Sequence, residues 1–315
     1  MNFPLPGQDH PLGADELEAS APACVLTFNA SDPSGASGVG ADIATIAAMG
    51  AHALPVVTSI LVRDSAEVFD VHEIEADAVV EQARSVLEDI TISAWKVGFL
   101  GSAEGISAVA EILSDYADVP LVSYLPNLSW MEDDAQAAYL EAFRELILPA
   151  TLVLVGSHNT LTDCLLPDWD AERVPSAREL AVAAAEQGAD YVLVTGIQLP
   201  DQFIDNVLAS PQGAMCGERF ERFEATFVGA GDTLSAALAA ILSSGTALDV
   251  AAAEALSFLD QALDAGFRPG MGGVIPDRFF WALPPGDEPA SPQTSEEPVD
   301  LLDDTVPPLH SRNVH

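Results

Sequence analysis

Short apolar runs alternate with stretches of helical periodicity through the middle of this chain. Runs rich in valine, leucine and isoleucine predict strands at residues 23–29, 54–62, 94–100, 120–125, 151–156 and 190–195. Stretches in which apolar residues return every three or four positions predict helices at residues 39–49, 77–89, 103–115, 133–147, 174–187, 231–243 and 247–265. Strands and helices therefore follow one another in a regular β-α order.

This order predicts an α/β fold. Several of the strands are apolar throughout, which is typical of a parallel sheet covered by helices on both faces. Right-handed crossovers then give a three-layer α/β/α domain with a mostly parallel central sheet. Residues 204–223 have strand-like pieces on either side of a turn with proline and glycine, and they predict a hairpin near the sheet edge.

The two ends of the chain differ from its middle. Residues 1–22 and 284–315 are polar, acidic and contain many prolines. Such segments bury too little apolar surface to offset the entropy lost on ordering. We therefore expect a domain over residues 23–283 between two disordered tails.

The charge balance restricts the partners. The chain has 49 acidic and 11 basic side chains, which gives a net charge of −38, and Lys96 is its single lysine. Because so acidic a surface repels nucleic acid and anionic membranes, we exclude both as partners. A bound nucleotide would need backbone N–H groups, arginine and a metal ion.

Cysteine usage and hydropathy favour the cytoplasm. Cys24, Cys164 and Cys216 are widely spaced and form no CxxC pair, so neither a disulfide framework nor a zinc site is indicated. The first twenty residues lack the basic and apolar regions of a signal peptide. The chain also has no apolar run of about 18 residues that would predict a membrane span.

A glycine-rich segment near residue 230 carries the clearest chemical signal. Gly229-Ala230-Gly231-Asp232 precedes a predicted helix. The glycines let backbone N–H groups approach a ligand, and the helix start attracts anions. An aspartate in the first turn could accept a proton from a hydroxyl beside that anion site. An ordinary helix start is the alternative interpretation.

A second loop of small residues, at residues 29–42, follows the first predicted strand. Ligands of parallel α/β sheets bind where strands end and loops begin. The loop matches neither the phosphate-binding P-loop nor the GxGxxG spacing. Alternatively, Ser31 and Asp32 hold a purely structural turn.

Together these two segments resemble the ribokinase-like superfamily, and within it the hydroxymethylpyrimidine/phosphomethylpyrimidine kinases of thiamine biosynthesis. The resemblance covers roughly residues 23–283, including Lys96–Leu100 and Gly270–Gly273. It implies a ribokinase-like fold that transfers a phosphoryl group from ATP, with Mg²⁺, to a pyrimidine alcohol. Dimers are common in families of this kind, so a homodimer is also an expectation.

The resemblance implies the catalytic residues. Asp232 stands where the superfamily has its catalytic aspartate, although the pyrimidine kinases usually have cysteine there. Gly229, Ala230 and Gly231 would supply the anion hole for the transferred γ-phosphoryl group.

The resemblance also implies a substrate pocket. Asp42 matches the acid that hydrogen-bonds the aminopyrimidine, and Ala30 and Ser37 match small residues that line the pocket. Phe99 replaces the methionine that stacks on the ring. Arg63 replaces a substrate-binding glutamine, and its fixed charge favours an anionic acceptor. A paired, structural Arg63 remains the alternative.

The nucleotide and metal positions depart furthest from the family pattern. Asn159 remains from an Asn-x-x-Glu metal motif whose glutamate is missing, and Asp163 could lie on the same helix face. The family's Lys-Gly pair reads Thr195-Gly196. Lys96 matches a lysine on the third predicted strand, which we interpret as structural. Tyr124 replaces an acid at the end of the next strand.

We therefore expect a kinase that phosphorylates the hydroxymethyl group of a pyrimidine. Two alternatives remain open. One is a pyridoxal-type vitamin B6 kinase. The other is a degenerate member that binds a pyrimidine or a nucleotide without turnover, which the altered metal motif favours.

Overall fold

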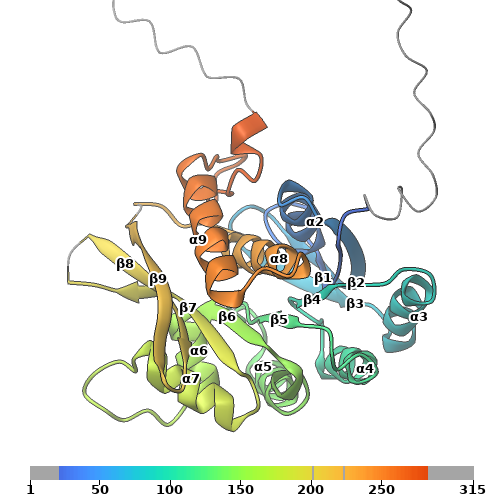
Figure 1. The fold of residues 1–315 in the computed structure, drawn as a ribbon, viewed down its shortest axis with the longest axis horizontal. Helices are drawn as coiled ribbons and strands as arrows, with labels where there is room; N and C mark the ends of the chain where they lie inside the picture. Colours follow the sequence, from blue (N-terminus) through green and yellow to red (C-terminus); the bar gives the residue numbers. More distant parts are fainter. Residues whose placement is uncertain (1–20, 201, 223, 283–315) are drawn as a thin grey trace, which may run out of the picture. The chain divides into compact units, whose positions relative to one another are not determined.

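The computed structural model describes residues 21–282, except residues 201 and 223 (Figure 1). The expected tails, 1–22 and 284–315, lie outside the described residues apart from residues 21 and 22. The disorder expected of them thus stays a prediction. The domain ends at Phe280, and of the residues after it only 281 and 282 are described. Among the described residues, no helix combines the length and the apolarity that a membrane crossing requires.

A single sheet forms the middle of the domain. Its nine strands in the described residues have the order β3-β2-β1-β4-β5-β6-β7-β8-β9. The bounds are β1 Cys24–Ser31, β2 His52–Arg63, β3 Val68–Glu73, β4 Ala94–Val97, β5 Leu121–Tyr124, β6 Val153–Ser157, β7 Tyr191–Gln198, β8 Phe203–Ser210 and β9 Gly213–Glu221. Strands β2, β1, β4, β5, β6 and β7 pair in parallel, whereas β3, β8 and β9 join antiparallel at the edges.

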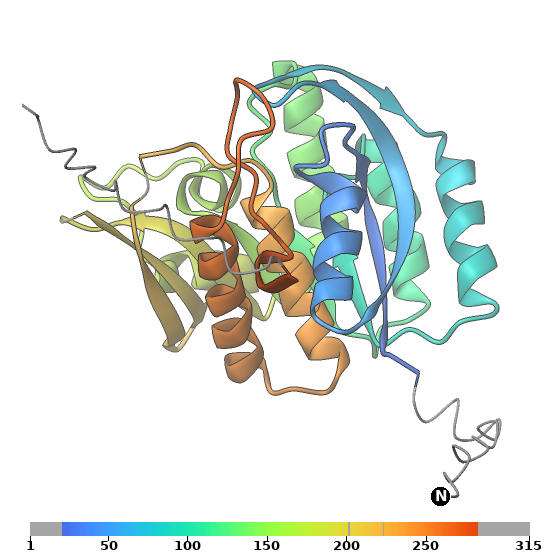
Figure 2. The ribbon, with the colours of Figure 1, turned by 90° about the horizontal axis from the view of Figure 1, so that it is seen from above.

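Helices cover both faces of the sheet (Figures 1 and 2). Their bounds are α2 Gly38–Ala48, α3 Ala76–Leu87, α4 Ala103–Ser114, α5 Asp133–Ala142, α6 His158–Leu165, α7 Ala177–Glu186, α8 Ala230–Ser243 and α9 Leu248–Asp264. Helices α2, α8 and α9 lie on one face, and α3 to α7 lie on the other. Side chains of β1 alternate between the faces, because Leu26 and Phe28 belong to one apolar cluster and Val25 to the other.

The structure confirms the three-layer α/β/α fold and the predicted hairpin, which is formed by β8 and β9. Sequence periodicity missed β3, whose side chains are mostly exposed and therefore show no apolar alternation. It also missed α6, an eight-residue helix. The predicted helix over 133–147 is regular only to Ala142 and continues as a π-helical turn to Ile147.

Helix α8 lies against the middle of the sheet. Its residues from Asp232 to Leu242 are buried on every side, because the helix packs between the sheet, α2 and α9. Alanines make up much of this helix and permit the close approach of its neighbours. The amino end of α8 thus lies at a fixed place beside the carboxyl ends of β1, β4 and β5.

Helix α2 offers a matched pair of substitutions that tests this packing. Ile46 is fully buried and Ile43 is 42% exposed. We expect Ile46→Ala to lower the free energy of unfolding by about 2–5 kcal/mol, because it leaves a cavity in the core. Ile43→Ala should change it by about 0.5 kcal/mol or less. Urea unfolding of both variants measures the difference, and equal effects would contradict the packing described here.

Candidate active site

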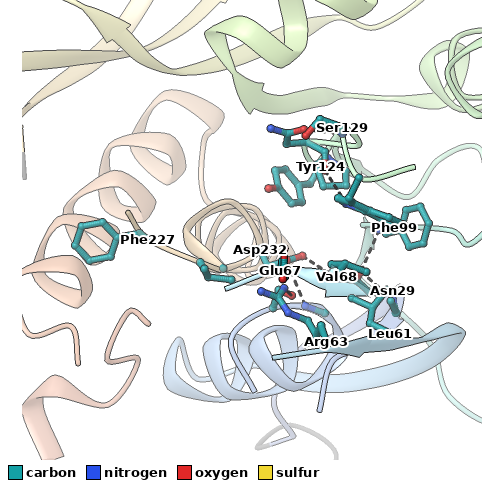
Figure 3. A pocket seen from close by; sticks show the side chains of 18 of the residues that line it. Asn29, Leu61, Arg63, Glu67, Val68, Phe99, Tyr124, Ser129, Phe227 and Asp232 are labelled. Carbon is teal, nitrogen blue, oxygen red and sulfur yellow. Dashed lines mark hydrogen bonds between the residues drawn. The ribbon is translucent and has the colours of Figure 1, made fainter. Parts of the chain in front are cut away.

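A cavity of about 640 Å³ lies at the carboxyl ends of the parallel strands. Figure 3 shows Phe99 and Tyr124 on one side of it, Arg63 on the other and Asp232 between them. Of the residues expected to bind substrate, Ala30, Ser37, Arg63 and Phe99 all line this cavity. The β2–β3 connection, which the sequence did not indicate, contributes further lining residues. Open α/β sheets bind ligands at this edge.

Gly229 sets the start of α8. It has a φ of +85°, a left-handed conformation that favours glycine. A Cβ at this position would also overlap the carbonyl oxygen of Ala36. The first turn of α8 therefore lies directly against the loop after β1, and its N–H groups and dipole face the region between them.

Asp232 lies in the first turn of α8 and is held by three donors. Its Oδ1 accepts hydrogen bonds from Asn29 Nδ2 at 2.8 Å and from Lys96 Nζ at 2.7 Å. Its Oδ2 accepts a longer bond, 3.3 Å, from the backbone N–H of Gly38. Asp232 lines the cavity although it is almost completely buried. Asp232 is thus fixed in orientation and lies next to the cavity.

Lys96 connects Asp232 to a second carboxylate. Its Nζ is 2.8 Å from Asp42 Oδ1, and both side chains are fully buried. Thr27 and Asn29 also donate to Asp42, at 2.5 and 3.0 Å. Burial alone would lower the pKa of Lys96, but the carboxylates of Asp232 and Asp42 raise it above its usual value. Burial raises the pKa of Asp42, against the effect of Lys96.

The position of Asp42 differs from the expected contact with an aminopyrimidine ring. Its carboxylate is buried beneath the cavity, does not line it, and accepts its bonds from protein groups. Lys96 fills the space between Asp42 and Asp232. Asn29, in contrast, both bonds to the two aspartates and lines the cavity.

Arg63 is paired. Its Nη1 lies 3.5 Å from Asp32 Oδ2 and donates to Ser37 Oγ at 3.4 Å, while Nε donates to the carbonyl oxygen of Asp64 at 2.9 Å. Asp32 also accepts from the backbone and hydroxyl groups of Ser34 and Ser37, so it organises the loop as a structural turn. Among the described residues, no hydrogen-bond partner accepts from Nη2 of Arg63.

Arg278 joins the two glycine-rich segments and was not found from the sequence. Its Nη2 donates to the carbonyl oxygen of Ala36 at 2.5 Å, and its Nε donates to Thr233 Oγ1 at 3.0 Å. One buried side chain thus fastens the loop after β1 to the first turn of α8. An arginine between Asp277 and Phe279 gives no sequence signal for this role.

A second cavity, of about 290 Å³, lies on the other side of the α8 start. Thr195, Gly196, Ala230 and Gly231 line it, as expected for nucleotide and anion-hole residues. Phe227 lines both cavities. The two cavities therefore meet at residues 227–232.

Asn159 and Asp163 do not form the expected metal-binding site. Both side chains are exposed on α6 and line neither cavity. Within the described part of the chain, no group of three or more His, Cys, Asp or Glu side chains could hold a metal ion. Tyr124, where an acid was expected, packs its ring so closely on Gly231 that a Cβ there would overlap it. These residues do not fit a bound Mg²⁺.

The α/β fold and two cavities that meet at a helix start fit a small-molecule kinase, the class to which the family comparison assigns the chain. Residues 32–276 match the phosphomethylpyrimidine kinase family, and the chain belongs to this family. It is 32% identical to the hydroxymethylpyrimidine/phosphomethylpyrimidine kinase of Streptomyces coelicolor over 264 residues, which cover 83% of this chain and 96% of that protein. The Escherichia coli kinase of the same name is 30% identical over 268 residues, covering 82% and 97%.

Solved structures show the same fold. An ADP complex of Bacillus subtilis pyridoxal kinase has a TM-score of 0.75 at 23% identity, and the match covers 84% of this chain and all of that one. Phosphomethylpyrimidine kinase from Clostridium difficile has a TM-score of 0.61 at 22% identity, covering 75% and 97%. At these identities the similarity shows the fold alone.

The close approach at Gly229 is testable against a second left-handed glycine. Gly245 has a φ of +83°, but a Cβ added there would meet no atom of the described residues within 4 Å. Gly245→Ala therefore adds backbone strain only, about 1–2 kcal/mol. Gly229→Ala should lower the free energy of unfolding by clearly more, because its methyl group displaces Ala36 and Arg278. Guanidinium unfolding compares the two, and a smaller effect at Gly229 would refute the close contact.

Proposed function

We propose that the protein transfers the γ-phosphoryl group of ATP to the hydroxymethyl group of hydroxymethylpyrimidine, or to the phosphate of its monophosphate, as a step of thiamine biosynthesis. One observation carries the proposal. A cavity with a fixed carboxylate and a second cavity with helix N–H groups meet at the same turn, residues 227–232. Family membership and the names of the relatives support the choice of acceptor.

The acceptor fits the larger cavity. Phe99 packs against Trp130 with ring centroids 5.3 Å apart, and both line the cavity with Leu61. Aromatic and aliphatic side chains of this kind stack on a flat heterocycle. With its ring there, the hydroxymethyl group can reach Asp232 at the cavity floor.

The chemical step needs a base and a place for negative charge. Asp232 accepts the hydroxyl proton, and the oxygen forms a bond to the γ-phosphorus while the bond to the departing ADP breaks. In the proposed step, the N–H groups of Ala230 and Gly231 at the start of α8, together with the helix dipole, stabilise the charge that spreads over the transferred phosphoryl group. Thr195 and Gly196 line the cavity proposed for the nucleotide. We assign no step to Mg²⁺, because the residues present do not fit it.

Removing the base tests the mechanism. We expect Asp232→Asn to lower the rate of ADP release by about 10²–10⁴-fold, since an amide cannot take up the hydroxyl proton. The Michaelis constant for the acceptor should change little. Asp163→Asn on the exposed face of α6 is the matched control and should retain full activity. A coupled ADP assay with hydroxymethylpyrimidine measures both, and an active Asp232→Asn variant would overturn the role of this residue.

Arg63 is the proposed selector of an anionic acceptor, because the described residues leave its Nη2 donors free at the cavity wall. We expect Arg63→Gln to raise the Michaelis constant for the monophosphate by about tenfold or more, the effect of losing a charged hydrogen bond. The constant for the unphosphorylated alcohol should change by less than about threefold. Arg84→Gln, in a remote exposed ion pair, is the control. Equal changes for both acceptors would mean that Arg63 only holds Asp32.

A noncatalytic binding protein is the second candidate, because the expected metal residues lie away from both cavities. Assays with hydroxymethylpyrimidine and with pyridoxal separate the candidates. ADP release with the pyrimidine supports the first function, and release with pyridoxal alone makes the protein a vitamin B6-type kinase. If calorimetry detects pyrimidine binding and neither alcohol yields ADP, the binding protein is correct.

The proposed setting is the cytoplasm, where ATP is available. The free state of Cys24, Cys164 and Cys216 supports a reducing compartment. The homodimer remains a prediction.

A further inference from the structure

Lys96, the single lysine of the chain, lies on β4, and its side chain is fully buried beneath the larger cavity. Its Nζ lies 2.7 Å from Asp232 Oδ1 and 2.8 Å from Asp42 Oδ1. The same ammonium group is 5.7 Å from the ring centroid of Tyr124, a further favourable contact. Four different segments therefore meet at one cation: β4, α2, α8 and the end of β5.

Stability does not explain this cluster. Two carboxylates and one ammonium group taken out of water carry one net negative charge between them, and Arg278 is a further buried cation whose charge acts on both carboxylates. Well-packed apolar residues of similar size are often as stable as a buried ion pair, or more so. A buried ionic cluster that lies under a ligand cavity is better explained by what it does to the one carboxylate that reaches the cavity.

The hydrogen bonds distinguish the two oxygens of Asp232. Lys96 and Asn29 both donate to Oδ1 at short distances. Among the described residues, Oδ2 has a single donor, the N–H of Gly38, at 3.3 Å. Rotation of the carboxylate would exchange these oxygens and break the two short bonds. Oδ2 is thus the oxygen with lone pairs left for a ligand.

We propose that Lys96 is a positioning residue for Asp232, and that Asp42 is the counter-charge that fixes Lys96 in place. This inference rests on the proposed kinase function. Lys96 holds Oδ1 of Asp232 and so leaves Oδ2 turned towards the acceptor. The proton of the acceptor hydroxyl moves to Oδ2, and Lys96 keeps its own proton throughout. Asp42 holds Lys96 from below and does not contact the substrate.

Removing Lys96 should affect kcat and KM differently. The maximal kcat should fall, because the carboxylate loses its orientation, while KM for the acceptor stays nearly constant.

A double variant separates positioning from stability. Lys96→Met leaves Asp42 buried without its partner and lowers stability, whereas Lys96→Met/Asp42→Asn removes both charges and should recover much of it. If Lys96 positions Asp232, the double variant keeps the low kcat and a nearly unchanged KM for the acceptor. If the role is structural, activity returns with stability, and the proposal is overturned. The double variant also serves if Lys96→Met fails to fold.

A measurement without turnover keeps this test apart from the proposed function. A crystal structure of the double variant shows the orientation of the Asp232 carboxylate. We expect this carboxylate to rotate, so that Oδ1 leaves the hydrogen bond from Asn29 Nδ2, which is 2.8 Å long in the wild type. Arg84→Met, which removes an exposed ion pair with Asp115, should leave the carboxylate in place. An unmoved carboxylate refutes the inference even if the protein is a kinase. A rotated carboxylate with no ADP release from any alcohol refutes the kinase function and leaves the positioning role of Lys96 standing.

Discussion

The ion pair between Lys96 and Asp232 connects the central sheet to the helix that carries the site. It fixes the first turn of α8 relative to β4, and through Asn29 and Asp42 it reaches β1 and α2. Arg278 fastens the same turn to the loop after β1 from the other side. Asp232 and the helix N–H groups are therefore held in one geometry before any ligand arrives, as in preorganised sites that stabilise developing charge.

Because the chain has few basic side chains, the contacts of those near the site show how many remain to bind a phosphate. Near the site, Lys96 forms ion pairs with two aspartates. Arg278 donates hydrogen bonds to a backbone oxygen and to Thr233, and Arg63 forms an ion pair with Asp32. A transferred phosphoryl group would therefore be stabilised mainly by backbone N–H groups and the dipole of α8. Backbone donors suit an acidic protein, because they add no charge that neighbouring carboxylates would neutralise.

The sequence predicted the three layers and the glycine-rich start of α8, because apolar strands, an apolar helix and glycine-rich turns leave local patterns. It also identified Arg63 and Phe99 at the cavity wall. It did not predict β3 or α6. It could not show that Asp42 lies beneath the cavity. The burial of this α2 side chain depends on its contacts with Thr27 of β1 and Lys96 of β4, which are far from it in the sequence. The roles of Asn29, Lys96 and Arg278 depend on contacts between segments far apart in the chain. Asn159 and Asp163 share a helix face, but that face points away from both cavities.

The central claim is that the acceptor alcohol and the phosphoryl donor meet at the first turn of α8. A crystal structure with hydroxymethylpyrimidine and a nonhydrolysable ATP analogue tests it most directly. The account predicts the pyrimidine against Phe99, its hydroxyl oxygen about 2.6–3.2 Å from Asp232 Oδ2, and the γ-phosphate at the N–H groups of Ala230 and Gly231. A pyrimidine bound elsewhere, or a γ-phosphate directed away from α8, would contradict it.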